Sequence, residues 1–132
     1  MDRLIRALVA EDSKITRILQ CELLRERGVE VLEASDGRQA LDLALKKRPQ
    51  LLILDGLMPV YTAFDVLAKL REGAPEYQPR VFIVTALYKS RRWESEARTR
   101  YEVDEYLEKP LEPADLLAVV ERHFVLDQPA TS

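Results

Sequence analysis

Five polar residues stand at or just beyond the ends of four apolar runs, and their types suit phosphate chemistry. Carboxylates that lie close together either shift their pKa values or bind a cation. An all-oxygen ligand set suits a hard cation such as Mg²⁺. A further carboxylate could then attack phosphorus, while a lysine balances the charge and a hydroxyl donates a hydrogen bond. The five residues are Glu11, Asp12, Asp55, Thr85 and Lys109.

Each of these residues has a simpler explanation when it is taken alone. Asp12 could cap a helix, Asp55 could belong to a turn, Thr85 could end a strand and Lys109 could be a solvated charge. Together they favour a site in which Glu11 and Asp12 hold Mg²⁺ and Asp55 is the nucleophile. The product would be an acyl phosphate, and its new charge would bias the surrounding loops between two conformations. This chemistry indicates a switch and not a metabolic enzyme.

The elements that must position these residues follow from hydrophobic periodicity. Short apolar runs alternate with helix-period segments, which predicts strand–helix units around a parallel sheet in an α/β fold. In a doubly wound sheet, ligands bind beyond the carboxyl ends of the strands. The predicted strands cover residues 4–10, 29–34, 51–54, 81–84 and 103–107, and the predicted helices cover 13–27, 35–48, 62–73, 90–101 and 113–124.

The first and fourth predicted helices differ in the strength of their apolar stripe. The first begins at a cap supplied by Asp12 or Ser13. The fourth is rich in charge and has only a narrow stripe, so we expect it to be marginal or mobile. The stripe of the first helix is predicted to face the core and consists of Ile15, Ile18, Leu19 and Leu23.

Composition bounds the class of protein. With 132 residues, 47% of them hydrophobic and 33% charged, the chain suits one globular domain, for which we expect residues 1–125 and a tail at 126–132. The net charge of −3 argues against direct binding to nucleic acid. Cys21 is the only cysteine, so no internal disulfide can form, and no apolar run reaches membrane-spanning length. We therefore expect a cytoplasmic protein that does not insert into a membrane.

Four motifs carry a specific resemblance to a known family. They are Leu8-Val9-Ala10-Glu11-Asp12, Ile53-Leu54-Asp55-Gly56-Leu57-Met58-Pro59, Val84-Thr85-Ala86 and Tyr106-Leu107-Glu108-Lys109-Pro110. With them the chain resembles, from about residue 4 to 124, the receiver domain of bacterial two-component response regulators, similar to the chemotaxis regulator. The resemblance implies a flavodoxin-like, doubly wound sheet of five parallel strands in the order 2-1-3-4-5, with about five helices.

The resemblance also implies roles for individual residues. Asp55 would receive a phosphoryl group from a sensor histidine kinase or a histidine phosphotransfer protein. The backbone carbonyl of Leu57 would join Glu11 or Asp12 and Asp55 around Mg²⁺. Tyr106 would be the switch aromatic that swings inward when Thr85 moves toward the phosphate. Lys109-Pro110 would be a cis peptide, which is credible because cis bonds occur before proline.

The implied protein is regulatory and not an enzyme in the usual sense, since it catalyses only its own phosphorylation and slow dephosphorylation. Its further partners would be a downstream protein target or a fused output domain, and a homodimer is possible. Leu57 and Leu87 stand two residues after Asp55 and Thr85, where apolar side chains should keep water from the acyl phosphate. We therefore expect slow autodephosphorylation.

The chain departs from the family pattern in two places. Thr62-Ala63 replace a frequent Asp-Gly, so the loop after Asp55 could take a different path. Tyr101-Glu102-Val103 replace a frequent Ala-Gly-Ala, which could displace the fourth helix and the usual partner face. The same region is basic and could suit an acidic partner surface, through Arg91, Arg92, Arg98 and Arg100.

Three other functions compete with the switch. A receiver-like adaptor would bind partners without phosphorylation, although the complete set of site residues argues against it. A haloacid-dehalogenase-like phosphatase would need a second Asp two positions after its nucleophile, where this chain has Leu57. A flavin-binding module would need a phosphate loop rich in Ser, Thr and Gly, whereas the acidic Glu11-Asp12 pair would repel phosphate.

Overall fold

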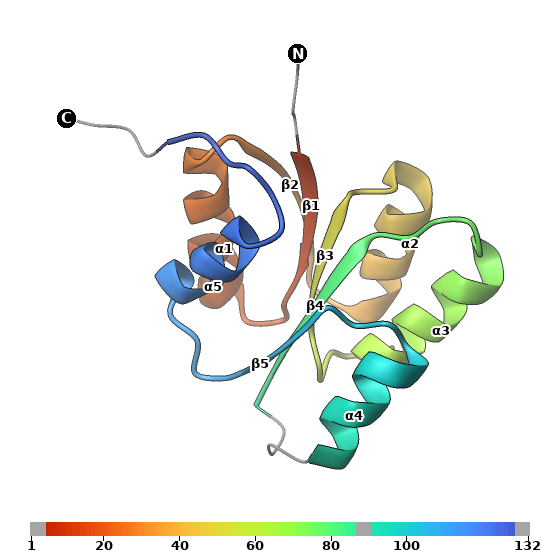
Figure 1. The fold of residues 1–132 in the computed structure, drawn as a ribbon. Helices are drawn as coiled ribbons and strands as arrows, with labels where there is room; N and C mark the ends of the chain where they lie inside the picture. The colour runs from red at the N-terminus through yellow and green to blue at the C-terminus, as the bar shows by residue number, and fades with distance from the viewer. Residues whose placement is uncertain (1–4, 87–90, 129–132) are drawn as a thin grey trace.

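The computed structural model describes residues 5–86 and 91–128 of the chain. Its centre is one sheet of five parallel strands in the order β2-β1-β3-β4-β5 (Figure 1). The predicted strand order and α/β class are therefore confirmed. The strands are β1 (Ile5–Ala10), β2 (Val29–Ala34), β3 (Leu51–Asp55), β4 (Arg80–Thr85) and β5 (Glu105–Glu108).

Helices cover both faces of the sheet. In Figure 1, α1 and α5 lie on one side of the sheet, while α2, α3 and α4 lie on the other. Each face has its own core: Leu24 and Leu116 meet Phe82 on the first side, and Leu67 and Leu70 belong to the second. The helices are α1 (Lys14–Glu26), α2 (Gly37–Lys47), α3 (Ala63–Gly73), α4 (Arg91–Arg100) and α5 (Pro113–Glu121).

The central strand β3 is buried along its whole length. A continuous apolar run is what a strand covered on both faces requires. The run ends at Asp55, which is placed at the carboxyl edge of the sheet together with the ends of β1 and β4.

Three helix starts are fixed by side-chain caps. The hydroxyl of Ser13 accepts a hydrogen bond from the N–H of Thr16, so Ser13 and not Asp12 caps α1. Asp36 caps α2. Thr62 caps α3 and forms a reciprocal capping box with Asp65. Asp12 is thereby left available at the edge of the sheet.

The prediction for the core-facing stripe of α1 is wrong. Ile15, Ile18 and Leu19 are 73%, 38% and 49% exposed. The helix instead buries the side that carries Cys21 and Leu24. An apolar stripe is therefore left on the outer face of α1.

The fourth helix is regular from Arg91 to Arg100, and Ala97 anchors it in the core. It ends where Glu102 takes a left-handed φ of 56° and the N–H of Val103 reaches back to the carbonyl of Ala97. The fifth strand starts at Glu105, two residues later than predicted. The carboxylate of Asp104 accepts the hydrogen bond from the N–H of Val81, and this side-chain contact takes the place of a backbone contact between the strands.

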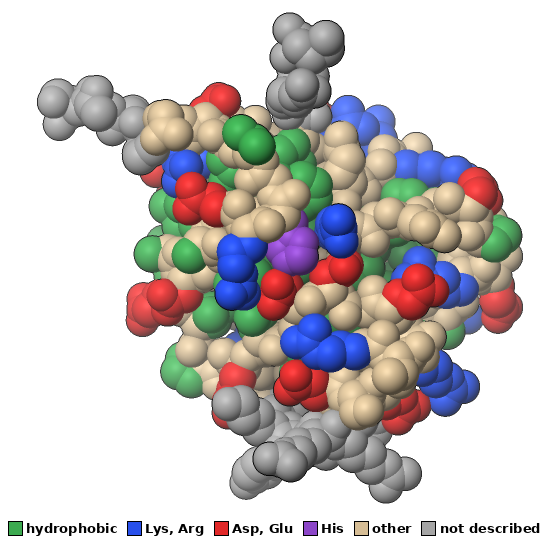
Figure 2. Space-filling view, viewed as in Figure 1, with side chains coloured by type: hydrophobic (Ala, Val, Ile, Leu, Met, Phe, Trp, Pro, Cys, Tyr) green, Lys and Arg blue, Asp and Glu red, His purple; other side chains and the backbone are tan. Residues whose placement is uncertain are grey.

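The positive charge predicted for the region of α4 is partly neutralised by glutamates of the same helix. Arg98 pairs with Glu94 and Arg100 pairs with Glu96, at 3.3 and 3.2 Å. The side chains of Arg91 and Arg92 lie outside the described residues. On the face shown in Figure 2, acidic and basic side chains are interspersed and do not gather into one broad patch.

The chain after α5 folds back over the end of α1. The helix ends at Glu121, three residues earlier than predicted, and Leu126 packs against the core beneath it. Arg27 is buried there, donates to the carbonyl of Asp127 and forms an ion pair of 2.8 Å with Glu121. Among the described residues, no helix combines the length and apolar character needed to cross a membrane.

Candidate functional site

The fold brings the predicted site residues to one edge of the sheet. Glu11 and Asp12 follow β1, Asp55 ends β3 and Thr85 ends β4. Lys109 follows β5 directly, and its N–H donates to the carbonyl of Thr85 at 2.8 Å. Because parallel strands end at the same edge, four separate segments contribute to one cluster.

Three carboxylates lie close enough to hold a metal ion. One oxygen each of Glu11, Asp12 and Asp55 lies within 4.8 Å of the others. Glu11 and Asp55 are buried, at 2% and 5% exposure, whereas Asp12 is exposed. This arrangement of hard oxygen ligands, open to solvent on one side, fits a Mg²⁺ ion that keeps part of its water shell.

Lys109 is the cation that the protein itself supplies to this cluster. Its Nζ lies 2.7 Å from Glu11 Oε1 and 3.2 Å from Asp55 Oδ2. The other oxygens of the two acids are held by backbone: Ser13 N–H donates to Glu11 Oε2 at 2.9 Å, and Leu57 N–H donates to Asp55 Oδ1 at 3.1 Å. The nucleophile predicted from sequence is thus oriented on both oxygens.

Burial and crowding shift the acid–base properties of the pair. Burial, followed by the negative charge of Glu11, raises the pKa of Asp55 to about 6, against the lowering influence of the Leu57 N–H and of Lys109. Burial by itself would lower the pKa of Lys109, but its hydrogen bond to Glu11 and the charges of both acids outweigh burial and raise that pKa. Lys109 therefore stays charged, whereas the charged form of Asp55 is the one that the fold disfavours.

Thr85 approaches the site across a glycine. It is 1% exposed, and a Cβ added to Gly56 would lie 2.5 Å from its hydroxyl oxygen. Only a glycine after Asp55 therefore lets the Thr85 hydroxyl come so close to the end of β3.

The loop after Asp55 carries two exposed apolar residues. Leu57 is 53% exposed, and Val60 is 63% exposed with a left-handed φ of 73°. A β-branched residue adopts that conformation only under strain. The different path expected from Thr62-Ala63 stays a prediction, and the loop ends where Thr62 caps α3. Leu87, the second residue predicted to exclude water, lies outside the described residues.

Tyr106 lies on β5, paired in register with Ile83. Its hydroxyl is buried and has no hydrogen-bond partner among the described residues. Burial, with a smaller contribution from Glu94, raises its pKa. The peptide between Lys109 and Pro110 is cis, as the resemblance implied.

The geometry agrees with a comparison of the sequence against known families. The family described as the response regulator receiver domain matches residues 7–121. This chain belongs to that family. The receiver domain is a regulatory unit of two-component signalling and not a conventional enzyme.

Relatives and solved structures support the same assignment. The transcriptional regulatory protein PdtaR of Mycobacterium tuberculosis is 33% identical over 117 residues, which are 88% of this chain and 55% of that protein. The transcriptional regulatory protein CpxR of Escherichia coli (strain K12) is 36% identical over 111 residues, 84% of this chain and 45% of that protein. This receiver domain therefore spans about half the length of these two relatives.

A solved structure shares both the fold and its extent. The chemotaxis response regulator CheY4 of Vibrio cholerae superimposes with a TM-score of 0.81 and 29% sequence identity. The match covers 91% of this chain and 98% of that one.

Sequence reasoning missed three residues at this edge. Gly56 makes room for Thr85, and its place directly after Asp55 was the available signal. Arg17 donates to the carbonyl of Glu11 at 2.7 Å. Gln20 is 4% exposed and lies in the first helix between residues predicted to face the core. Nothing in the sequence separates the last two from ordinary polar helix residues.

Proposed function

We propose that this receiver domain is a phosphoacceptor switch in which Asp55 receives a phosphoryl group in the presence of Mg²⁺. The observation that carries the proposal is the double contact of Lys109 Nζ with Glu11 and Asp55, at 2.7 and 3.2 Å, beside an acidic cluster. A lysine in that place can follow the charge as it moves from the carboxylate to the transferred group.

The donor in this proposal is a phosphohistidine of a sensor histidine kinase or of a histidine phosphotransfer protein. An oxygen of Asp55 attacks phosphorus, the P–N bond to the imidazole breaks, and its electron pair returns to the ring nitrogen. The Leu57 N–H holds the carboxylate in place, and Lys109 contacts it directly. The Thr85 hydroxyl lies against Gly56, the next residue in the chain, and would donate a hydrogen bond to the new phosphoryl group. Bound Mg²⁺, held by Glu11, Asp12, Asp55 and the Leu57 carbonyl, would offset negative charge on the transferring group.

The acyl phosphate would be long-lived. Leu57 is apolar at the mouth of the site and offers no group that could orient an attacking water molecule. We expect the phosphorylated protein to hydrolyse more slowly than a Leu57→Asn variant, and a faster loss from the unaltered chain would refute this part of the proposal.

The phosphorylated state would be read by other proteins through a change in the surface around β5 and α4. Tyr106 is the proposed switch aromatic, because its ring lies on β5 near α4 and its buried hydroxyl has no described partner to hold it. In this proposal residues 1–125 form the receiver domain, 126–132 form the tail, and the readers are a downstream protein, a fused output domain or a second copy of the chain.

The direct test is the intact mass of the protein after incubation with Mg²⁺ and phosphoramidate. We expect a gain of one phosphoryl group that disappears with a chelator and in Asp55→Asn. Asp42→Asn is the matched control, since Asp42 is an exposed aspartate on α2. A folded protein that gains no phosphoryl group would refute the switch and favour a phosphorylation-independent adaptor.

A further inference from the structure

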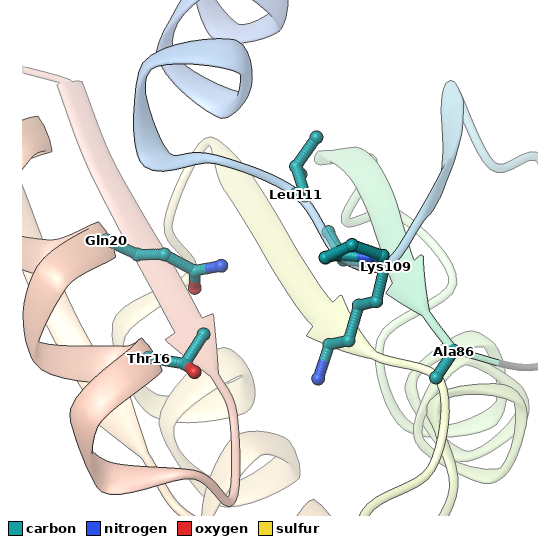
Figure 3. Close-up of a pocket in the computed structure, with 7 residues that line it drawn as sticks. Thr16, Gln20, Ala86, Lys109 and Leu111 are labelled. Carbon is teal, nitrogen blue, oxygen red and sulfur yellow. The ribbon is translucent and has the colours of Figure 1, made fainter.

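A cavity of about 440 Å³ lies beside the candidate phosphoacceptor site, between α1 and the segment that follows β5 (Figure 3). Its volume falls in the range of small-molecule pockets. Most of its wall is apolar, while Thr16, Gln20 and Lys109 supply the polar groups. The lining residues are Thr16, Gln20, Val84, Ala86, Lys109, Pro110 and Leu111.

Gln20 is the unusual member of this lining. Its side chain is 96% removed from solvent, yet its carboxamide forms no hydrogen bond with any residue that the structure describes. In Figure 3 the carboxamide points from α1 into the cavity, toward Lys109 and Leu111. Among the described residues, the carboxamide is not one of the fully buried polar atoms, so its nitrogen and oxygen reach into the cavity, where water or a ligand can meet them. A ligand head group that pairs with both the donor and the acceptor of Gln20 would replace that water.

The charges around the cavity select against an anion. Lys109 already contacts Glu11 and Asp55, and Asp12 adds a third carboxylate to the same cluster. Lys109 is the one charged residue among the described residues that line the cavity, and it is already shared by two carboxylates, which would repel an added negative charge. The matching head group is neutral and presents a donor and an acceptor side by side.

We propose that this cavity is a binding site for a small neutral carboxamide or lactam with an apolar body. The head group would form a reciprocal pair of hydrogen bonds with Gln20. The body would lie against Val84, Pro110 and Leu111. This site goes beyond the phosphoacceptor function and requires no phosphoryl transfer, so either proposal can fail without the other.

The test is ligand binding to the whole chain, without Mg²⁺ or phosphodonor, followed by methyl NMR of the lining residues Thr16, Val84, Ala86 and Leu111. The probes are benzamide, its anionic isostere benzoate, and toluene, which lacks the head group. We expect benzamide to shift these methyl signals and to bind about tenfold more tightly than either other probe, as two buried hydrogen bonds predict.

Two variants and one control make the result specific. Gln20→Leu keeps the size of the side chain and should reduce benzamide affinity about tenfold, to the level of toluene, without lowering the urea midpoint. Ala86→Leu should weaken binding of benzamide and toluene alike by filling the cavity. Gln78→Leu, the same exchange between α3 and β4 at the opposite edge of the sheet, should change neither affinity.

Several results would overturn the proposal. If no probe shifts the methyl signals up to its solubility limit, the cavity holds only water. If toluene binds as tightly as benzamide, or Gln20→Leu binds benzamide unchanged, the cavity is an apolar pocket without an amide site. If benzoate binds most tightly, the cavity is an anion site and not a site for a neutral amide.

Discussion

The two edges of the sheet use buried charge in opposite ways. At the carboxyl edge, Glu11, Asp12 and Asp55 share one lysine, and the pKa of Asp55 is raised to about 6. At the amino edge, Arg27 faces Glu121 and the carbonyl of Asp127. The first cluster has an excess of negative charge, whereas the second is balanced.

This difference distinguishes a site from a structural contact. A balanced ion pair holds two segments together and needs no additional ion. An unbalanced cluster lowers the stability of the metal-free fold, and that cost persists unless a cation or a proton relieves it.

The largest effect should come from breaking the balanced edge. Arg27→Ala removes the partner of Glu121 and of the Asp127 carbonyl, and it leaves a space where the buried side chain lay. We expect the free energy of unfolding in urea to fall by about 2–4 kcal/mol. Glu121→Gln should cost less, because the Glu121 side chain is 45% exposed. Equal losses would show that the packing of Arg27 is unimportant.

Removing a charge from the unbalanced cluster should instead raise the free energy of unfolding. In the unfolded chain Asp55 has a pKa near 4, and in the fold it is about 6. Between these values the folded protein keeps a proton that the unfolded chain has released, so stability falls as pH rises. Asp55→Asn should therefore raise the free energy of unfolding at pH 8 by about 1–3 kcal/mol without metal.

The pH dependence provides the control for that prediction. As the pH falls below 4, Asp55 becomes protonated in the unfolded chain as well, so the advantage of Asp55→Asn should shrink toward zero. Urea unfolding of both proteins at pH 8 and pH 3.5, in the presence of a chelator, measures the difference. An advantage that does not change with pH would mean that the charge of Asp55 carries no penalty.

Magnesium should relieve the same excess of charge. For a dissociation constant near 1 mM, 10 mM Mg²⁺ stabilises the fold by about 1.4 kcal/mol. The urea midpoint of the unaltered chain should rise by the matching amount, while that of Asp12→Asn should rise less. Ca²⁺, which takes a larger coordination shell, is a useful comparison. An equal rise in both proteins would place the ion elsewhere.

The smallest effect concerns a neutral group, the hydroxyl of Tyr106 on β5. Tyr106→Phe removes a buried hydroxyl that has no described partner, so the free energy of unfolding should stay the same or rise by up to about 1 kcal/mol. A loss above that size would reveal a partner for the hydroxyl. Thermal unfolding of the two proteins at one pH is sufficient to decide.

Much of the architecture followed from the sequence because strand and site signals coincide. The runs that end at Asp55 and Thr85 are apolar throughout, which only a strand covered on both faces tolerates. The parallel sheet then forces their polar ends together, so the acidic cluster could be inferred before its distances were known. The clustering of Lys109 with Glu11 and Asp55 followed from the same rule.

The face of α1 could not be predicted in that way. Ile15, Ile18 and Leu19 form a regular stripe, and so do Cys21 and Leu24 on another side. Periodicity identifies an amphipathic helix but does not say whether a stripe meets its own sheet or another molecule. The choice depends on tertiary packing, and α1 packs through its smaller, less apolar side.

The predicted boundaries of α4 and β5 were wrong for a different reason. Val103 looked like a strand residue, but the carboxylate of Asp104 takes a hydrogen bond that a strand backbone would otherwise provide. The left-handed φ of Glu102 ends α4 without a glycine. Such local competition between side chain and backbone has no periodic signature.

If Mg²⁺ binds at the acidic cluster, the two contacts of Glu11 would make this edge of the sheet respond to the magnesium concentration itself. One of its oxygens holds the start of α1 through Ser13, and the other holds Lys109. A metal ion that claimed the second oxygen would release the ammonium from one of its two tethers. In that case the ion and the lysine would compete for the same atom, and loading the site would free Lys109 for an incoming phosphoryl group before any donor arrives.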